Sequence, residues 1–141
     1  MKAMYTAHAT AEGGRQGHAR SDDGKVDVKL ASPPEMGGTG DGTNPEQLFA
    51  AGYAACFQGA MMFVGGQKKL NVEGSRVTGH VGIGQNDKGP GFALSVTHDV
   101  ELPNLSQADA EALVTAAHEV CPYSNATRGN IDVQFNVKGG Q

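Results

Sequence analysis

Two cysteines, one arginine and one glutamate are the residues of this chain whose types and spacing favour chemistry. Cys56 and Cys121 are the only 2 cysteines among 141 residues, and each lies on the apolar stripe of a predicted helix. Two thiols at core-facing positions can form a transient disulfide, or both can be small packing residues. Composition alone leaves both interpretations open.

A reactive thiolate needs a nearby cation, because burial among apolar groups raises the pKa of a cysteine. Arg15 follows Gly13-Gly14 in a segment predicted to be extended, where it can reach inward or remain solvated. Glu46 lies in the first turn of a predicted helix, where the helix dipole already favours an anion. Alternatively, its carboxylate holds the Arg15 guanidinium in a bidentate pair.

Glu46 and Cys56 are too far apart on one helix to share an arginine. Cys56 follows Glu46 by ten residues, which is roughly 15 Å along a helix that rises about 1.5 Å per residue. If Arg15, Glu46 and Cys56 form one site, we expect Glu46 to come from the other subunit of a dimer.

The histidines are weaker candidates for chemistry. His118 and Cys121 are three residues apart, a spacing that can hold a metal, but no carboxylate or second histidine is spaced beside them. We therefore expect no metal site. His80 and His98 lie in predicted strands and are expected at the surface.

Two helices and several strands must position these residues. Asn44-Pro45-Glu46-Gln47 predicts a helix start, with Asn44 as the cap, Pro45 in the first helical position and Gln47 completing a capping box. This helix should run to about residue 65, and because it is apolar on every face we expect it to be central and buried. A second helix should begin after Ser106 and end at Pro122. Its apolar stripe is Ala110, Leu113, Val114, Ala117, Val120 and Cys121.

A strand predicted over residues 3–10 continues extended over 15–20, and further strands are predicted over 26–30, 75–85, 91–102 and 131–137, with a short helical turn over 124–129. The order β-β-α-β-β-α-β, with antiparallel hairpins, predicts an α+β fold. The length predicts a single domain over residues 1–141.

Composition excludes several classes of function. The net charge is -4 and no basic cluster provides a footprint for nucleic acid. The N-terminus has no apolar core of a signal peptide, and the apolar run over 47–64 is slightly short for a membrane span and contains glycines and a glutamine. We therefore expect a cytoplasmic protein without a membrane segment. A permanent disulfide is disfavoured in the reducing cytoplasm.

Three blocks of sequence resemble the organic hydroperoxide resistance (Ohr) proteins of the OsmC/Ohr family. They are Gly13-Gly14-Arg15, the run GTNPEQLFAAGYAACF over 42–57 and the run VCPYSNATRGNIDV over 120–133. The resemblance covers nearly the whole chain. It implies an OsmC-like α+β fold, with antiparallel sheets around two long buried helices, in an intertwined homodimer with two sites at its interface.

The resemblance also implies a function: a thiol peroxidase that removes organic hydroperoxides, with alkyl or fatty-acid tails, and binds no cofactor. By position, Cys56 would be the peroxidatic cysteine and Cys121 the resolving one, while Arg15 and Glu46 would activate Cys56. The implied reductant is dihydrolipoamide or a lipoylated protein. Three alternatives remain: an OsmC-type hydroperoxidase with a broader substrate range, a non-enzymatic thiol redox sensor, and a binding or structural protein with two inert cysteines.

Overall fold

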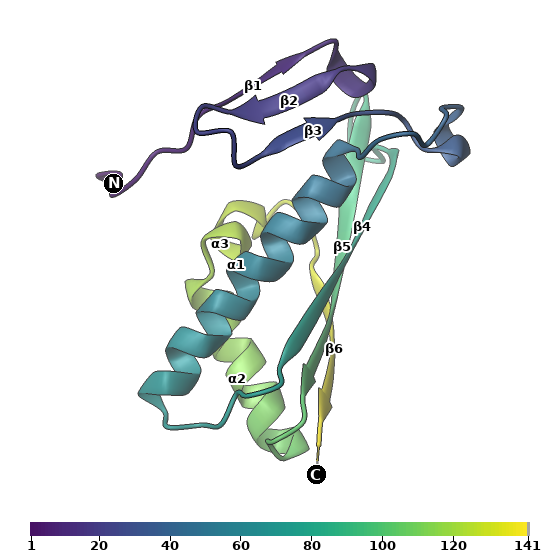
Figure 1. Ribbon diagram of the computed structural model, residues 1–141. Coiled ribbons are helices and arrows are strands. Elements are labelled where there is room, and N and C mark those ends of the chain that lie inside the picture. The colour runs from purple at the N-terminus through teal and green to yellow at the C-terminus, as the bar shows by residue number, and fades with distance from the viewer. Residues whose placement is uncertain (141) are drawn as a thin grey trace. The chain divides into compact units, whose positions relative to one another are not determined.

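The computed structural model describes residues 1–140, which fall into two compact units, one up to Leu48 and the other from Phe49 onward. Each unit is described by itself. The elements in chain order are β1 (Ala9–Glu12), the 3-10 turn η1 (Gly14–Gln16), β2 (His18–Ser21), β3 (Asp27–Lys29), the 3-10 turn η2 (Pro34–Met36), α1 (Pro45–Gln67), β4 (Arg76–Gln85), β5 (Phe92–Leu102), α2 (Gln107–Val120), α3 (Pro122–Thr127) and β6 (Gln134–Gly139) (Figure 1). The predicted α+β class is confirmed.

The first unit contains an antiparallel sheet in the order β1-β2-β3. Its first strand occupies Ala9–Glu12, later than the extended segment predicted over 3–10. Arg15 is not extended as predicted, because Gly13 and Gly14 adopt φ angles of 78° and 57° and turn the chain into η1. Glycine is the residue that enters this left-handed region without a steric penalty.

The second unit contains a sheet in the order β4-β5-β6. Strands β4 and β5 form the predicted antiparallel hairpin, but β6 pairs with β5 in parallel. The expectation of purely antiparallel sheets is therefore wrong. Helices α2 and α3 lie between β5 and β6 in sequence and carry the chain back along the sheet, which is the kind of crossover that parallel strands require (Figure 1).

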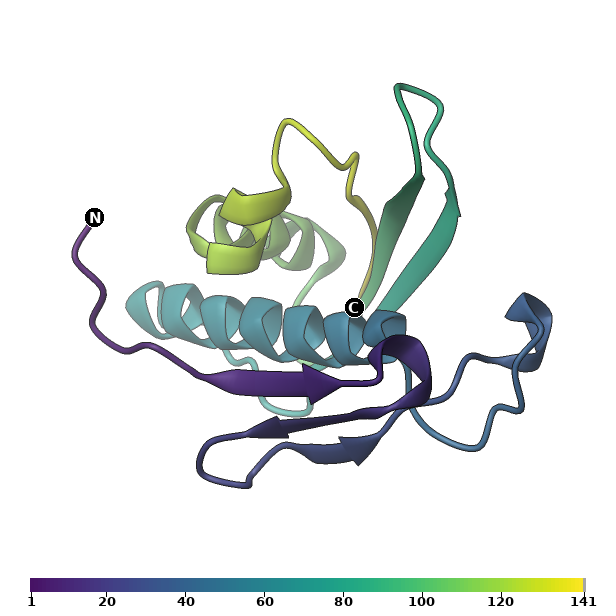
Figure 2. The same cartoon turned by 90° about the horizontal axis from the view of Figure 1, so that it is seen from above.

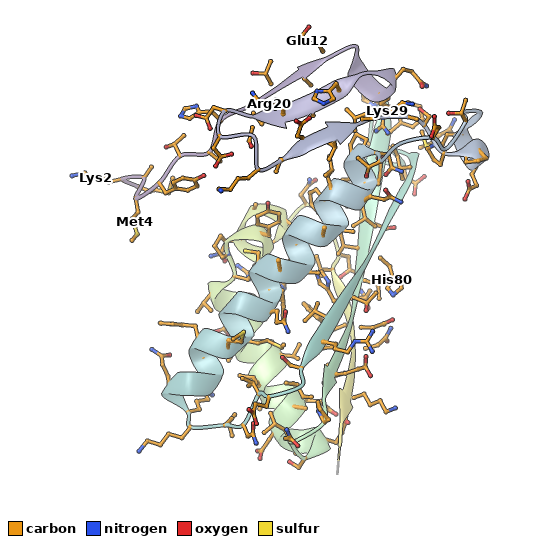
Figure 3. The ribbon with its side chains drawn as sticks, in the orientation of Figure 1. Lys2, Met4, Glu12, Arg20, Lys29 and His80 are labelled. Atoms are coloured by element: carbon orange, nitrogen blue, oxygen red, sulfur yellow. The ribbon has the colours of Figure 1, made fainter. Side chains whose placement is uncertain are left out.

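Helices α1 and α2 cover one face of this sheet (Figure 2). Strand β5 contributes the most deeply buried part of this face, because its inward residues Val96, His98, Val100 and Leu102 are all buried. His98 is therefore not at the surface as predicted: its exposed fraction is 0%. His80 lies on the other face, where its ring meets Asp99 (Figure 3).

Helix α1 is buried along one side only, contrary to the expectation that it is buried all round. Its buried residues are Tyr53, Phe57, Ala60, Met61, Val64 and Gly65, which follow the spacing of a single helical face. Met62 and Phe63 remain 55% and 62% exposed. Composition gave this helix apolar residues on every side, but the sheet and α2 can cover only the side that faces them.

By length and composition, α1 would also be able to cross a membrane. Core helices of globular proteins have the same length and composition, and the buried side of α1 belongs to the core.

The helix starts largely follow the sequence prediction. The Asn44 side chain accepts a hydrogen bond from the backbone N–H of Gln47 at 2.8 Å, as expected of a cap. The Gln47 side chain does not complete a capping box, since its Oε1 accepts from the Thr43 hydroxyl at 2.7 Å. Ser106 caps α2 by accepting from the N–H of Asp109. The predicted stripe of α2 is buried except at Val120, which is 46% exposed.

Candidate active site

The structure brings the two cysteines into contact. Cys56 lies in the middle of α1 and is half-buried, whereas Cys121 is fully buried between the end of α2 and the start of α3. Their Sγ atoms are 3.5 Å apart and both thiols are free. A disulfide needs a separation of about 2.05 Å, so a small movement would join them.

The surroundings of Cys56 keep its thiol protonated. Burial is the largest effect and raises the pKa of Cys56, and the contact with Cys121 raises it further. A backbone hydrogen bond from Tyr123 acts in the opposite direction but does not reverse the shift. A thiolate at this position therefore requires additional positive charge.

Arg15 and Glu46 form a bidentate ion pair inside the first unit. Arg15 Nη1 donates to Glu46 Oε2 at 3.0 Å, and Nη2 donates to Oε1 at 2.8 Å. The guanidinium lowers the pKa of the Glu46 carboxyl, and the carboxylate raises the pKa of Arg15. Because the pair forms within one chain, a site completed by Glu46 from another subunit would receive Arg15 from that subunit as well.

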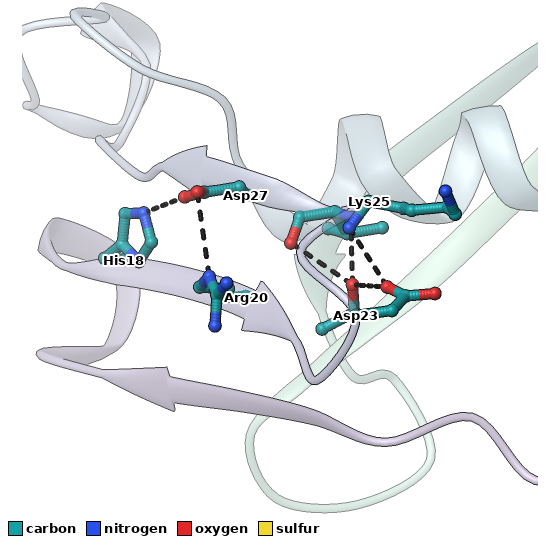
Figure 4. Close-up of polar contacts among 7 residues, drawn as sticks. His18, Arg20, Asp23, Lys25 and Asp27 are labelled. Carbon is teal, nitrogen blue, oxygen red and sulfur yellow. Dashed lines mark hydrogen bonds and ion pairs between the residues drawn. The ribbon is translucent and has the colours of Figure 1, made fainter.

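The other three arginines have different partners. Arg20 lies opposite Asp27, which also contacts His18 at 2.5 Å on the same sheet (Figure 4). Arg76 lies 3.9 Å from Glu101. Arg128 donates to the backbone carbonyl of His118 and to Asn125 Oδ1. Among residues 1–140, only Arg15 has the two-point carboxylate contact that fixes a guanidinium plane.

A network of polar groups around Cys121 was missed in the sequence. The Ser124 hydroxyl lies 2.8 Å from the Tyr53 hydroxyl and 2.8 Å from His118 Nδ1. Tyr53 also lies 3.3 Å from the Thr127 hydroxyl. A signal was present, because Tyr53 precedes Cys56 by three residues and Ser124 follows Cys121 by three, the spacing of one helical face.

His118 Nδ1 contacts the Ser124 hydroxyl, on the residue three positions after Cys121. Burial and the nearby Arg128 lower the pKa of His118, which favours the neutral ring. Within residues 1–140, no group of three or more His, Cys, Asp or Glu side chains is arranged to hold a metal ion.

The large apolar side chains that lie near Cys56 along α1 differ in accessibility. Tyr53, Phe57 and Met61 are fully buried in the core, and Phe63 is exposed. Phe49 lines a cavity of about 380 Å³. The remaining lining residues are Leu94, Tyr123, Ala126, Thr127, Asn130 and Ile131. This mostly apolar cavity therefore includes Tyr123, the residue whose backbone contacts the Cys56 thiol.

Known proteins are similar to this chain in both sequence and fold. Residues 38–136 match the family model described as OsmC-like protein. An organic hydroperoxide resistance protein of Xanthomonas axonopodis pv. citri is 57% identical over 138 residues, covering 96% of each chain. The organic hydroperoxide resistance protein OhrB of Bacillus subtilis is 46% identical over 136 residues, covering 96% of this chain and 99% of the relative. The crystal structure of an organic hydroperoxide resistance protein from Legionella pneumophila superposes with a TM-score of 0.92 at 50% identity, covering 97% of this chain and 99% of that one.

Proposed function

Because this chain belongs to the OsmC/Ohr family, among relatives named organic hydroperoxide resistance proteins, we propose that it is a cysteine-based peroxidase that reduces organic hydroperoxides to alcohols. The observation that carries the proposal is the contact of two free thiols at 3.5 Å. One thiol can be oxidised to a sulfenic acid by the peroxide, and the other is close enough to react with that sulfenic acid and form a disulfide.

The reaction has three balanced steps. The Cys56 thiolate attacks the distal oxygen of R–O–O–H, the O–O bond breaks, and the leaving alkoxide takes a proton to become the alcohol. Cys121 then attacks the Cys56 sulfenic acid, forming the disulfide and releasing water. A dihydrolipoyl dithiol, as dihydrolipoamide or on a lipoylated protein, reopens the disulfide through a mixed disulfide and is itself oxidised to the cyclic disulfide.

Arg15 supplies the positive charge that the first step requires. Burial raises the pKa of Cys56, so a cation near its sulfur is needed to form the thiolate and to stabilise charge on the peroxide oxygens. Glu46 holds the guanidinium at two points, so that little reorganisation accompanies the reaction.

The protein acts as a homodimer in which the Arg15–Glu46 pair of one subunit serves Cys56 of the partner subunit. Cys56 follows Glu46 by ten residues on α1, roughly 15 Å along the helix axis. An arginine clamped by Glu46 is thus too far along the helix to reach Cys56 of the same helix. The exposed apolar side chains Met62 and Phe63 on α1 are consistent with a second subunit.

The proposed enzyme works in the cytoplasm without a bound cofactor or metal. Apolar walls such as those of the cavity beside Phe49 favour a carbon tail by about 0.8 kcal/mol per buried methylene, which supports alkyl or fatty-acid hydroperoxides over hydrogen peroxide.

The decisive experiment is a steady-state peroxidase assay. An alkyl hydroperoxide and hydrogen peroxide are compared as oxidants, with dihydrolipoamide, thioredoxin and glutathione offered in turn as reductants. We expect turnover with the organic hydroperoxide and dihydrolipoamide. Similar rates with both peroxides would favour a broader OsmC-type hydroperoxidase. Oxidation without turnover by any dithiol would favour a redox sensor, and no thiol oxidation at all would refute the proposal.

A further inference from the structure

Ser124 is fully buried, yet its hydroxyl lies at the centre of a polar network. The Tyr53 hydroxyl and His118 Nδ1 each approach it to 2.8 Å. The Thr127 hydroxyl donates to the Ser124 carbonyl and lies 3.3 Å from the Tyr53 hydroxyl. A buried hydroxyl is tolerated only when its hydrogen bonds are made, and alanine would fill this place at lower desolvation cost if packing were its whole purpose.

The network surrounds the bend that carries Cys121. Cys121 is the single residue between α2 and α3, with extended backbone angles of φ -65° and ψ 124°. His118 lies three residues before it and Ser124 three residues after it. Their contact therefore closes across the bend and fixes the angle between the two helices at the cysteine.

Tyr53 ties this bend to the helix that carries Cys56. It lies on α1 three residues before Cys56, on the same side of the helix. The Tyr53–Ser124 contact thus joins the turn next to one cysteine to the turn next to the other. The Tyr123 hydroxyl makes a second close approach to α1, at Gly52. A Cβ added to Gly52 would lie only 3.0 Å from this hydroxyl, so a larger residue would crowd it.

We propose that Ser124, held between Tyr53 and His118, is a positioning residue that keeps the Cys121 thiol directed at the Cys56 sulfur for disulfide closure. The inference rests on the proposed function. In this step the S–S bond forms, the S–O bond of the Cys56 sulfenic acid breaks, and the departing hydroxide leaves as water with the Cys121 proton. Ser124 touches neither reacting atom; it acts by holding the attacking group in place, where effective concentration is high.

The test separates oxidation from closure in a single turnover. Reduced protein is mixed with one equivalent of an alkyl hydroperoxide, and peroxide loss is followed together with disulfide formation. The sulfenic acid is trapped with dimedone and counted by mass spectrometry. In Ser124→Ala we expect peroxide loss within about twofold of the unmodified protein and disulfide closure slower by about tenfold, a factor equal to about 1.4 kcal/mol and to one buried hydrogen bond. Dimedone adducts and over-oxidised Cys56 should accumulate.

Two further variants provide a second change in the network and a control outside it. Tyr53→Phe removes only the hydroxyl and retains the ring, so it tests the network even if Ser124→Ala does not fold; we expect a smaller slowing of closure. Thr115→Val is the matched control, because the Thr115 hydroxyl donates to the Glu111 carbonyl on α2 and lies outside the network. It should close the disulfide at the unmodified rate.

Three outcomes would overturn the inference. Closure at the unmodified rate in both network variants would show that the hydroxyls do not position Cys121. Equal slowing of oxidation and closure would show a general structural role. If the unmodified protein fails to consume any hydroperoxide, the proposed function fails instead. The positioning role is then judged from the equilibrium between the Cys56–Cys121 disulfide and dithiothreitol, which should move several-fold toward the reduced form in Ser124→Ala; an unchanged equilibrium would refute it.

Discussion

At the scale of single residues, the two thiols are close together but poorly activated. Burial and Cys121 both raise the pKa of Cys56, while the fixed guanidinium of Arg15 is clamped by Glu46. A buried thiol of raised pKa is inert until a cation approaches it. In the proposed chemistry, Cys56 and Cys121 form and break the disulfide, while the Arg15–Glu46 pair supplies the positive charge.

The cysteines should have unequal roles. Cys56→Ser should abolish peroxide consumption, because no sulfenic acid can form. Cys121→Ser should consume about one equivalent of hydroperoxide per chain and then stop, with Cys56 passing on to sulfinic acid. Stopped-flow peroxide consumption and intact-protein mass measure both results. Full peroxidase activity in Cys56→Ser would contradict the assignment of Cys56 as the peroxidatic cysteine.

Arg15→Ala should slow the first oxidation by about 100-fold or more, the usual effect of losing one preorganised group that stabilises charge in the transition state. Arg15→Lys should recover little of that rate, since an ammonium cannot make the two-point contact with Glu46. The rate of Cys56 alkylation against pH should shift to higher pH in both. Arg20→Ala is the control, because Arg20 lies opposite Asp27, and an equal loss of rate there would contradict the assignment.

At the scale of elements, strand β5 contributes an unusual core residue. His98 packs at a centroid distance of 4.3 Å from Tyr53 and 5.6 Å from both Phe57 and Phe135. Neither ring nitrogen has a hydrogen-bond partner within the described residues. Burial lowers the pKa of His98 to about 4, so the ring stays neutral at neutral pH. Its partner on β4 is Gly79, where an added Cβ would lie 3.1 Å from the Ala50 carbonyl oxygen and only in ordinary contact, at 3.5 Å, with the His98 ring.

This histidine should make the fold sensitive to acid. Its pKa is lower in the folded chain than the ordinary value of 6.5, so the unfolded chain binds more protons and stability falls as pH drops from 6.5 toward 4. The loss over this range should be roughly 3 kcal/mol, at about 1.4 kcal/mol per pKa unit. Denaturant unfolding at several pH values measures it. His98→Leu should remove most of this dependence and His80→Leu, at the exposed face, should not; parallel curves for all three proteins would contradict the prediction.

At the scale of the whole molecule, one chain does not bury all its apolar surface. The sheet β4-β5-β6 and α2 cover one side of α1, and large side chains such as Met62 and Phe63 remain exposed on another. Exposed apolar surface of this kind is typical of an interface. Together with the helical distance between Glu46 and Cys56, it supports a homodimer whose sites combine residues of both subunits.

Mixing two inactive variants tests shared sites directly. Cys56→Ser keeps the Arg15–Glu46 pair, and Arg15→Ala keeps both cysteines. Refolded together, they should recover about a quarter of the unmodified activity, since half of random dimers are mixed and each mixed dimer has one complete site. Analytical ultracentrifugation measures whether the refolded mixture is dimeric. No recovery in verified mixed dimers would place Arg15 and Cys56 of one site in the same chain.

The helices, most of the strands and the candidate residues could be predicted from the sequence, because they depend on local signals. Apolar periodicity, the Asn44 and Ser106 caps and the breaks at glycine and proline act over a few neighbouring residues. The motif blocks likewise pointed to Cys56, Cys121, Arg15 and Glu46 before any contact was known.

The contacts between segments that are distant in the sequence became known only from the folded chain. It paired β6 with β5 in parallel, placed His98 in the core, left one side of α1 exposed and joined Tyr53 to Ser124 across 71 residues. It also set the two sulfur atoms 3.5 Å apart. No local pattern encodes these outcomes, because a strand has two faces, a helix has several, and which one is buried depends on the surfaces that the rest of the chain brings against it.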